Sequence, residues 1–109
     1  MKTALCGCAT DGGDRKAHGV DPELKAGNLK RLRRIEGQIR GLQAMIEADR
    51  YCPDIMAQVA SAHEALRSVG RELMRNHLRH CVTAAVKAGG TRAQEGYDEL
   101  LDLIYTHAR

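Results

Sequence analysis

The sequence of 109 residues contains no tryptophan and no phenylalanine, and only three tyrosines. Its apolar side chains are otherwise those of leucine, isoleucine, valine, methionine and alanine, which suit the pairing of helices. One domain of this size buries a modest core, so this composition favours an oligomer over an isolated monomer. The sequence also lacks the clustered aromatic residues of RNA-binding modules that stack bases.

Long apolar runs are absent as well. Between Lys2 and Cys6 only two residues are apolar, too few for a signal peptide. No stretch approaches the roughly 18 apolar residues of a membrane span. We therefore expect a cytoplasmic protein without a membrane partner. In a reducing cytosol its four cysteines serve metal or redox chemistry more often than disulfides.

The spacing of apolar residues predicts an all-α chain. Residues 1–27 are expected to form a flexible arm, and residues 28–109 one helical domain. Gaps of three and four predict a first helix over residues 28–49. A second helix, with Pro53 at its first position, carries a heptad seam and is expected to reach residue 88, before Gly89 and Gly90. Thr91 and Gln94 then form a capping box at the start of a third helix.

Three residues form a candidate metal site. His77 and Cys81 are four residues apart and lie on one face of the second helix. Cys52 precedes that helix, and a straight helix of 25 residues spans roughly 37 Å, so Cys52 cannot reach its own His77. Two antiparallel copies would bring Cys52 of one subunit to His77 and Cys81 of the other. The open alternative is that both cysteines are small buried hydrophobic residues and His77 an ordinary polar one.

The type of donor limits the choice of metal. Two thiolates and an imidazole suit Cu(I), and also Ni(II) or Zn(II) if a fourth ligand arrives. His18, in the arm, could supply that fourth ligand. Cys6 and Cys8 could bind metal too, although incidental thiols in a mobile arm are equally consistent with the sequence.

Basic residues gather on the first two helices. They are compatible with binding to DNA phosphates, or with a solvated surface that is partly paired with nearby glutamates. No helix-turn-helix or zinc finger accompanies them, and no arrangement of nucleophile and base suggests an enzyme. The residues concerned are Lys30, Arg31, Arg33 and Arg34 on the first helix, and Arg67, Arg71 and Arg75 on the second.

Three separate stretches together resemble a known family. They are RLRRIEGQIRG at residues 31–41, DRYC at 49–52 and NHLRHC at 76–81. In this order and with these separations they are very similar to the copper-sensitive operon repressor family, which also includes nickel/cobalt, formaldehyde and persulfide sensors. The resemblance covers residues 28–104.

The resemblance implies a three-helix protomer without a helix-turn-helix. It further implies an antiparallel four-helix-bundle homodimer, and a dimer of dimers that makes a homotetramer. Cys52, His77 and Cys81 look like the ligands of the Cu(I)-sensing branch. Tyr51 and Glu99 match positions that hydrogen-bond the ligating histidine.

The implied function is metal-responsive transcriptional repression. Arg31 matches a first-helix position used in DNA binding, and the apo protein would bind double-stranded operator DNA. Metal binding would release the operator and derepress genes for metal efflux. The alternatives are a Ni(II) or thiol-reactive (formaldehyde or persulfide) sensor of the same family, or a cytosolic metal-buffering protein without a DNA target.

Overall fold

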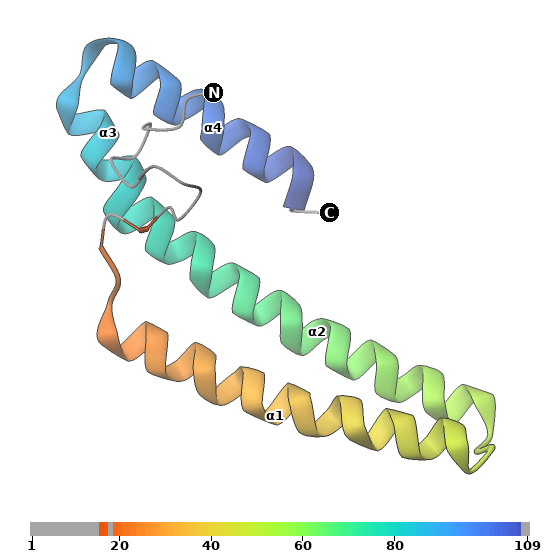
Figure 1. The fold of residues 1–109 in the computed structure, drawn as a ribbon. Helices are drawn as coiled ribbons and strands as arrows, with labels where there is room; N and C mark the ends of the chain where they lie inside the picture. Colours follow the sequence, from red (N-terminus) through yellow and green to blue (C-terminus); the bar gives the residue numbers. More distant parts are fainter. Residues whose placement is uncertain (1–15, 18, 108–109) are drawn as a thin grey trace. The chain divides into compact units, whose positions relative to one another are not determined.

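Helices account for nearly all of the chain that this computed structural model describes, residues 16–17 and 19–107 (Figure 1). The order is α1 (Pro22–Glu47), α2 (Cys52–Asn76), a π-helical segment η2 (His77–Val82), α3 (Thr83–Ala88) and α4 (Gly90–His107). No strand occurs in the described part, and the all-α prediction is confirmed. None of the described helices is both long and apolar enough to cross a membrane.

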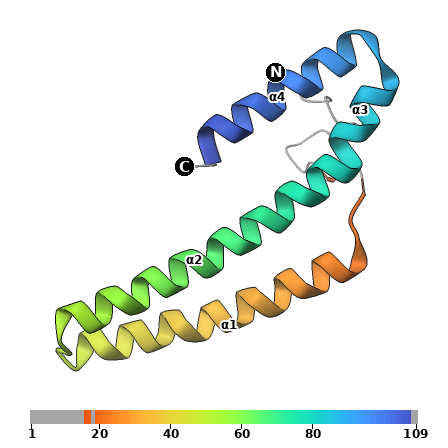
Figure 2. The same cartoon turned by 180° about the vertical axis from the view of Figure 1, so that it is seen from behind.

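The chain divides into two compact units. One is the α1–α2 hairpin, residues 22–73; the other, here called the C-terminal unit, combines residues up to 21 with residues from 74 onward. In the hairpin, α1 and α2 run side by side in both views (Figure 1 and Figure 2). Ile35, Ala62 and Val69 are buried there, and Gln38 Nε2 donates to Ser61 Oγ across the pair at 3.4 Å.

The turn between α1 and α2 fixes the position of Cys52. After α1, the N–H groups of Asp49 and Arg50 donate to the carbonyls of Ile46 (3.1 Å) and Met45 (3.0 Å). This is the Schellman pattern, and it requires the positive φ of 55° found at Asp49. The Tyr51 carbonyl then accepts the first hydrogen bonds of α2, so that Cys52 is the first helical residue.

In the C-terminal unit, α3 and α4 form a second hairpin. Gly89 and Gly90 make its turn with φ values of 73° and 56°, a conformation that glycine adopts without steric cost. Ala85 of α3 and Gly96 of α4 are buried, as are Cys81 and Val82 of η2.

Some predicted boundaries were wrong. α1 begins at Pro22 rather than near residue 28, because a proline is well tolerated in a first helical turn. The second helix does reach Ala88, but η2 interrupts its α-helical hydrogen bonding. α4 begins at Gly90, one residue before the expected cap, and the Gln94 amide donates to Asp98 at 3.4 Å. The division into an arm of residues 1–27 and a domain of residues 28–109 stays a prediction.

Candidate metal centre and nucleic-acid interface

The π-helical segment carries two of the three predicted ligands. His77 is its first residue, and Cys81 is buried at 1% exposure. The Leu78 carbonyl accepts two hydrogen bonds from Thr83, one from the backbone N–H and one from Oγ1 at 2.8 Å. The hydrogen bond from the Thr83 N–H reaches back five residues to the Leu78 carbonyl, and this i to i−5 pattern defines a π-helical turn. π-Helical turns are rare overall, and those that occur are frequently found at functional sites.

Glu99 lies beside the imidazole of His77. Its Oε1 is 3.5 Å from Nε2, and both side chains are 23% exposed. This distance is too long for a strong charge-assisted hydrogen bond, and Nε2 is buried without a hydrogen-bond partner among the described residues. Because Nε2 faces Glu99, Nδ1 is the ring nitrogen left to act as a ligand.

Cys52 stands apart from these residues in the chain. It is exposed at the opposite end of α2 from His77 and belongs to the α1–α2 hairpin. Among the described residues, no three His, Cys, Asp or Glu side chains come close enough to hold a metal ion. A complete site of Cys52, His77 and Cys81 therefore stays a prediction that needs a second copy of the chain.

Several other predicted site residues remain without a structural test. Tyr51 is 70% exposed, and its backbone carbonyl caps α2; a contact of its side chain with His77 stays a prediction. His18 lies outside the described residues, and so do Cys6 and Cys8.

A polar cluster next to the candidate ligands was not predicted. The buried side chain of Asn76 donates to the Gly19 carbonyl at 2.9 Å and accepts from the Asp21 N–H at 3.1 Å. The Asp21 carboxylate accepts from Arg79 Nη1 at 2.7 Å and from His80 Nε2 at 2.8 Å. We call these five residues the Asp21 clasp. Hydrogen bonds thus join Gly19 and Asp21 to the segment around His77.

The clasp also changes the chemistry of its acid. The hydrogen bond from His80, and then that from Arg79, hold the pKa of Asp21 below its usual value, and burial opposes them only in part. Gly19 lies so close to His80 that an added Cβ would be 2.8 Å from the ring Nδ1. The NHLRHC motif pointed to this segment, but no sequence pattern indicates that residues 19–21 pack on it.

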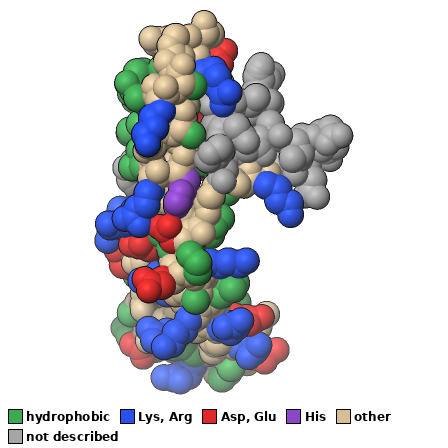
Figure 3. Space-filling model, turned by 90° about the vertical axis from the view of Figure 1, so that its left-hand side faces the viewer, with side chains coloured by type: hydrophobic (Ala, Val, Ile, Leu, Met, Phe, Trp, Pro, Cys, Tyr) green, Lys and Arg blue, Asp and Glu red, His purple; other side chains and the backbone are tan. Residues whose placement is uncertain are grey.

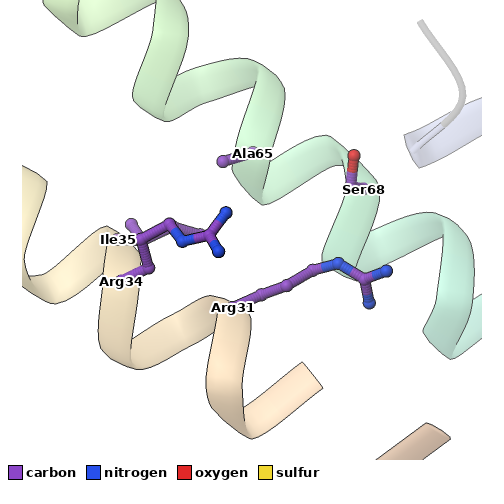
Figure 4. A pocket seen from close by; sticks show the side chains of 5 residues that line it. All are labelled: Arg31, Arg34, Ile35, Ala65 and Ser68. Carbon is purple, nitrogen blue, oxygen red and sulfur yellow. The ribbon is translucent and has the colours of Figure 1, made fainter. Parts of the chain in front are cut away.

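The α1–α2 hairpin holds a basic hollow. Its volume is about 160 Å³, and Arg31, Arg34 and Ile35 of α1 line it with Ala65 and Ser68 of α2 (Figure 4). Arg31 also donates to Asn28 Oδ1 at 3.3 Å. Two guanidinium groups beside a hydroxyl can bind an anion such as a phosphate.

The remaining predicted DNA-binding residues are exposed. The surface around them is not purely basic, because it also carries glutamates. Arg67 Nε lies 3.6 Å from Glu64, and Arg40 lies 3.9 Å from Glu36. Acidic and basic side chains are interspersed on the face seen in Figure 3. The assignment to DNA stays a prediction for all seven positions: Lys30, Arg31, Arg33, Arg34, Arg67, Arg71 and Arg75.

Residues 25–106 match the sequence model of a family described as metal-sensitive transcriptional repressors. The chain belongs to this family. It is 51% identical over 77 residues to the copper-sensing transcriptional repressor RicR of Mycobacterium tuberculosis (strain ATCC 25618 / H37Rv), an alignment that covers 71% of this chain and 79% of RicR. It is 45% identical over 74 residues to the copper-sensing transcriptional repressor CsoR of Bacillus subtilis (strain 168), with 68% and 71% covered.

A solved structure agrees with these relatives. The copper-sensing repressor CsoR from Geobacillus thermodenitrificans NG80-2, in complex with Cu(I), superposes with a TM-score of 0.74 at 41% identity. The match covers 84% of this chain and 93% of CsoR. The resemblance to the copper-sensitive operon repressor family is thereby confirmed.

The residues of η2 fit a soft metal ion of the kind that such repressors bind. Cys81 offers a sulfur in a buried position, and His77 has one buried ring nitrogen directed at a carboxylate. A ligating histidine commonly donates its second ring N–H to a carboxylate, which orients the ring. Glu99 lies 3.5 Å from Nε2, on the side of the His77 ring where such a carboxylate would be expected.

Proposed function

We propose that this protein is a Cu(I)-responsive transcriptional repressor that binds operator DNA in the apo form and leaves it on binding Cu(I). The observation that carries the proposal is the pair formed by buried Cys81 and by His77, whose Nε2 is directed at Glu99. The copper-sensing relatives named above support the choice of metal. Operator release would derepress genes for metal efflux. We place the protein in the cytoplasm.

The proposed ligands are His77, through Nδ1, and Cys81 of one subunit with Cys52 of its partner. Cu(I), when bound, supplies a soft cation that prefers thiolate and imidazole donors. The task of His77 is to present Nδ1 while Glu99 fixes the ring through Nε2. The exposed position of Cys52 at the start of α2 leaves its thiol accessible to a second subunit.

The surface of α2 supports assembly into an antiparallel homodimer. Met56, Val59, Leu66 and Leu73 are all exposed large hydrophobic residues. Their spacing of three and seven residues follows a heptad seam. Large apolar patches on a folded chain mark interaction sites, and a second copy of α2 running the other way would cover the seam. Homodimers would then pair into the homotetramer.

Operator DNA would be held through phosphate contacts. The hollow between Arg31, Arg34 and Ser68 offers donors for one backbone phosphate. The other exposed basic residues would extend this contact along the duplex. Such contacts position a protein on DNA without themselves reading the base sequence.

The test combines metal and DNA binding. Operator fragments are selected from genomic DNA by binding to the reduced apo protein, and their affinity is measured by fluorescence anisotropy during anaerobic titration with Cu(I), Ni(II) or Zn(II). We expect Cu(I) alone to abolish binding at one ion per protomer, with a thiolate-to-copper absorption band. Release by Ni(II) or Zn(II) and not by Cu(I) would refute the choice of metal. Cu(I) binding without any selected DNA would identify a buffering protein.

A further inference from the structure

At Gly96, α4 lies close against α3. Gly96 is buried on α4, and a Cβ built on it would lie 2.9 Å from the Cβ of Ala85, a residue with 0% exposure on α3. Real Cβ atoms essentially never come this close. The helical glycines Gly37, Gly41 and Gly70 differ, because a Cβ added there meets nothing within 4 Å in the described chain.

The same contact governs the surroundings of His77. Glu99 follows Gly96 by three residues on α4, so both lie on the side of the helix that faces its neighbours. Ala85 belongs to α3, which continues directly from η2 and its His77. The separation of α3 and α4 at Gly96 therefore sets the reach of the Glu99 carboxylate to His77 Nε2, now 3.5 Å.

We propose that Gly96 is a positioning residue for the His77–Glu99 pair. Its missing side chain lets α4 come close enough to α3 for Glu99 to orient the imidazole. With an alanine at position 96, its Cβ and the Cβ of Ala85 would have to separate from 2.9 Å to an ordinary contact distance of 3.4–4 Å. A shift of that size would lengthen the His77–Glu99 separation from 3.5 Å to roughly 4 Å or more, which takes the carboxylate further from the roughly 2.7–3.2 Å of an N–H···O hydrogen bond.

The first test uses the apo protein, so its result does not depend on the proposed function. The tautomer of His77 is read from its imidazole ¹⁵N and ¹H chemical shifts in the full-length protein. In the parent, Glu99 should favour the form with the proton on Nε2. Gly96→Ala should shift the population toward the other tautomer. The double variant Ala85→Gly/Gly96→Ala moves the methyl group from one helix to the other and should restore the parent spectrum.

Two further variants control for general effects. Gly41→Ala adds a methyl group to an open helical position and should leave the His77 signals unchanged. Ala85→Gly alone removes the facing methyl group and should keep the parent tautomer. A parent-like spectrum of Gly96→Ala would overturn the proposal. So would a double variant that folds, as judged by circular dichroism, but keeps the altered tautomer. If Gly96→Ala does not fold, the double variant decides alone.

The second test rests on the proposed function and measures operator affinity with and without saturating Cu(I). We expect the ratio of the two affinities to fall about five-fold or more in Gly96→Ala, within the usual range of such couplings, and to recover in the double variant. An unchanged ratio would refute a role of Gly96 in signalling. A parent that does not respond to Cu(I) would refute the proposed function instead, while the tautomer result would still test the positioning.

Discussion

Replacing Glu99 separates the capture of metal by His77 from the signal that capture sends. The two side chains are each 23% exposed and 3.5 Å apart. At this length Nε2 has no hydrogen-bond partner in the described part of the chain and the contact is weak in the apo protein, so Glu99→Ala should change the free energy of unfolding by about 1 kcal/mol or less. Urea unfolding of the apo protein, followed by circular dichroism, measures this change.

The effect on the metal-bound protein should be much larger. The loss of a carboxylate that orients a ligating histidine typically costs about 10–100-fold in metal affinity, while Cys52, His77 and Cys81 remain as ligands. The drop in operator affinity caused by Cu(I), a coupling typically worth about 1–3 kcal/mol, should largely disappear. Glu99→Gln, which keeps the shape of the side chain and an acceptor oxygen, should lie between the parent and Glu99→Ala.

The assay is operator affinity by anisotropy, with and without saturating Cu(I), in the parent and both variants. Cu(I) affinity is measured separately by competition with a chelator, so that saturation is certain in each protein. Equal affinity ratios in the parent and Glu99→Ala would refute the reasoning. Glu99 would then lie outside the coupling route, and the signal would pass through the pairing of helices alone.

Three other predictions follow from the same structure. Cys52→Ser and Cys81→Ser should each still bind the operator by anisotropy but no longer release it with Cu(I); normal release would remove that cysteine from the sensing site. Arg31→Ala should weaken operator binding and reduce the slope of log affinity against log salt by about one unit, and a parent-like slope would exclude a phosphate contact. Because the hydrogen bond from His80 lowers the pKa of Asp21, the clasp should stabilise the fold above the ordinary pKa and lose this contribution as the pH falls through the lowered value. Asp21→Asn should therefore show a weaker loss of stability than the parent between about pH 5 and pH 2 in urea unfolding; identical pH profiles would contradict the predicted linkage.

The helices could be predicted because each carries a local pattern. Apolar gaps of three and four mark α1 and α2, and the pair Gly89 and Gly90 marks the turn before α4. The π-helical segment could not be predicted, because the periodicity of apolar residues does not distinguish a π turn from an α turn within a continuous helix. The hydrogen bonds of Thr83 to the Leu78 carbonyl become visible only in three dimensions.

The candidate site was predictable in part. The spacing of His77 and Cys81 placed both on one face, and the position of Glu99 beside His77 was expected only from the family resemblance. The Asp21 clasp was missed because its hydrogen bonds join residues 55 to 59 positions apart in the chain. Contacts at that separation depend on the tertiary fold. No local pattern in the sequence, such as a periodicity of apolar residues, indicates which distant residues will meet.

Two features of the protomer have the same explanation in the proposed assembly. The protomer presents two candidate ligands on η2 and the third, Cys52, at the other end of α2. It also exposes large apolar residues such as Met56 and Leu73 along that helix. An antiparallel second copy of α2 would cover these apolar residues and bring the partner's thiol to His77 and Cys81. The hydrophobic seam would then set the register that completes the metal site, so that the ligand set depends on the packing of α2 rather than on a local sequence motif alone.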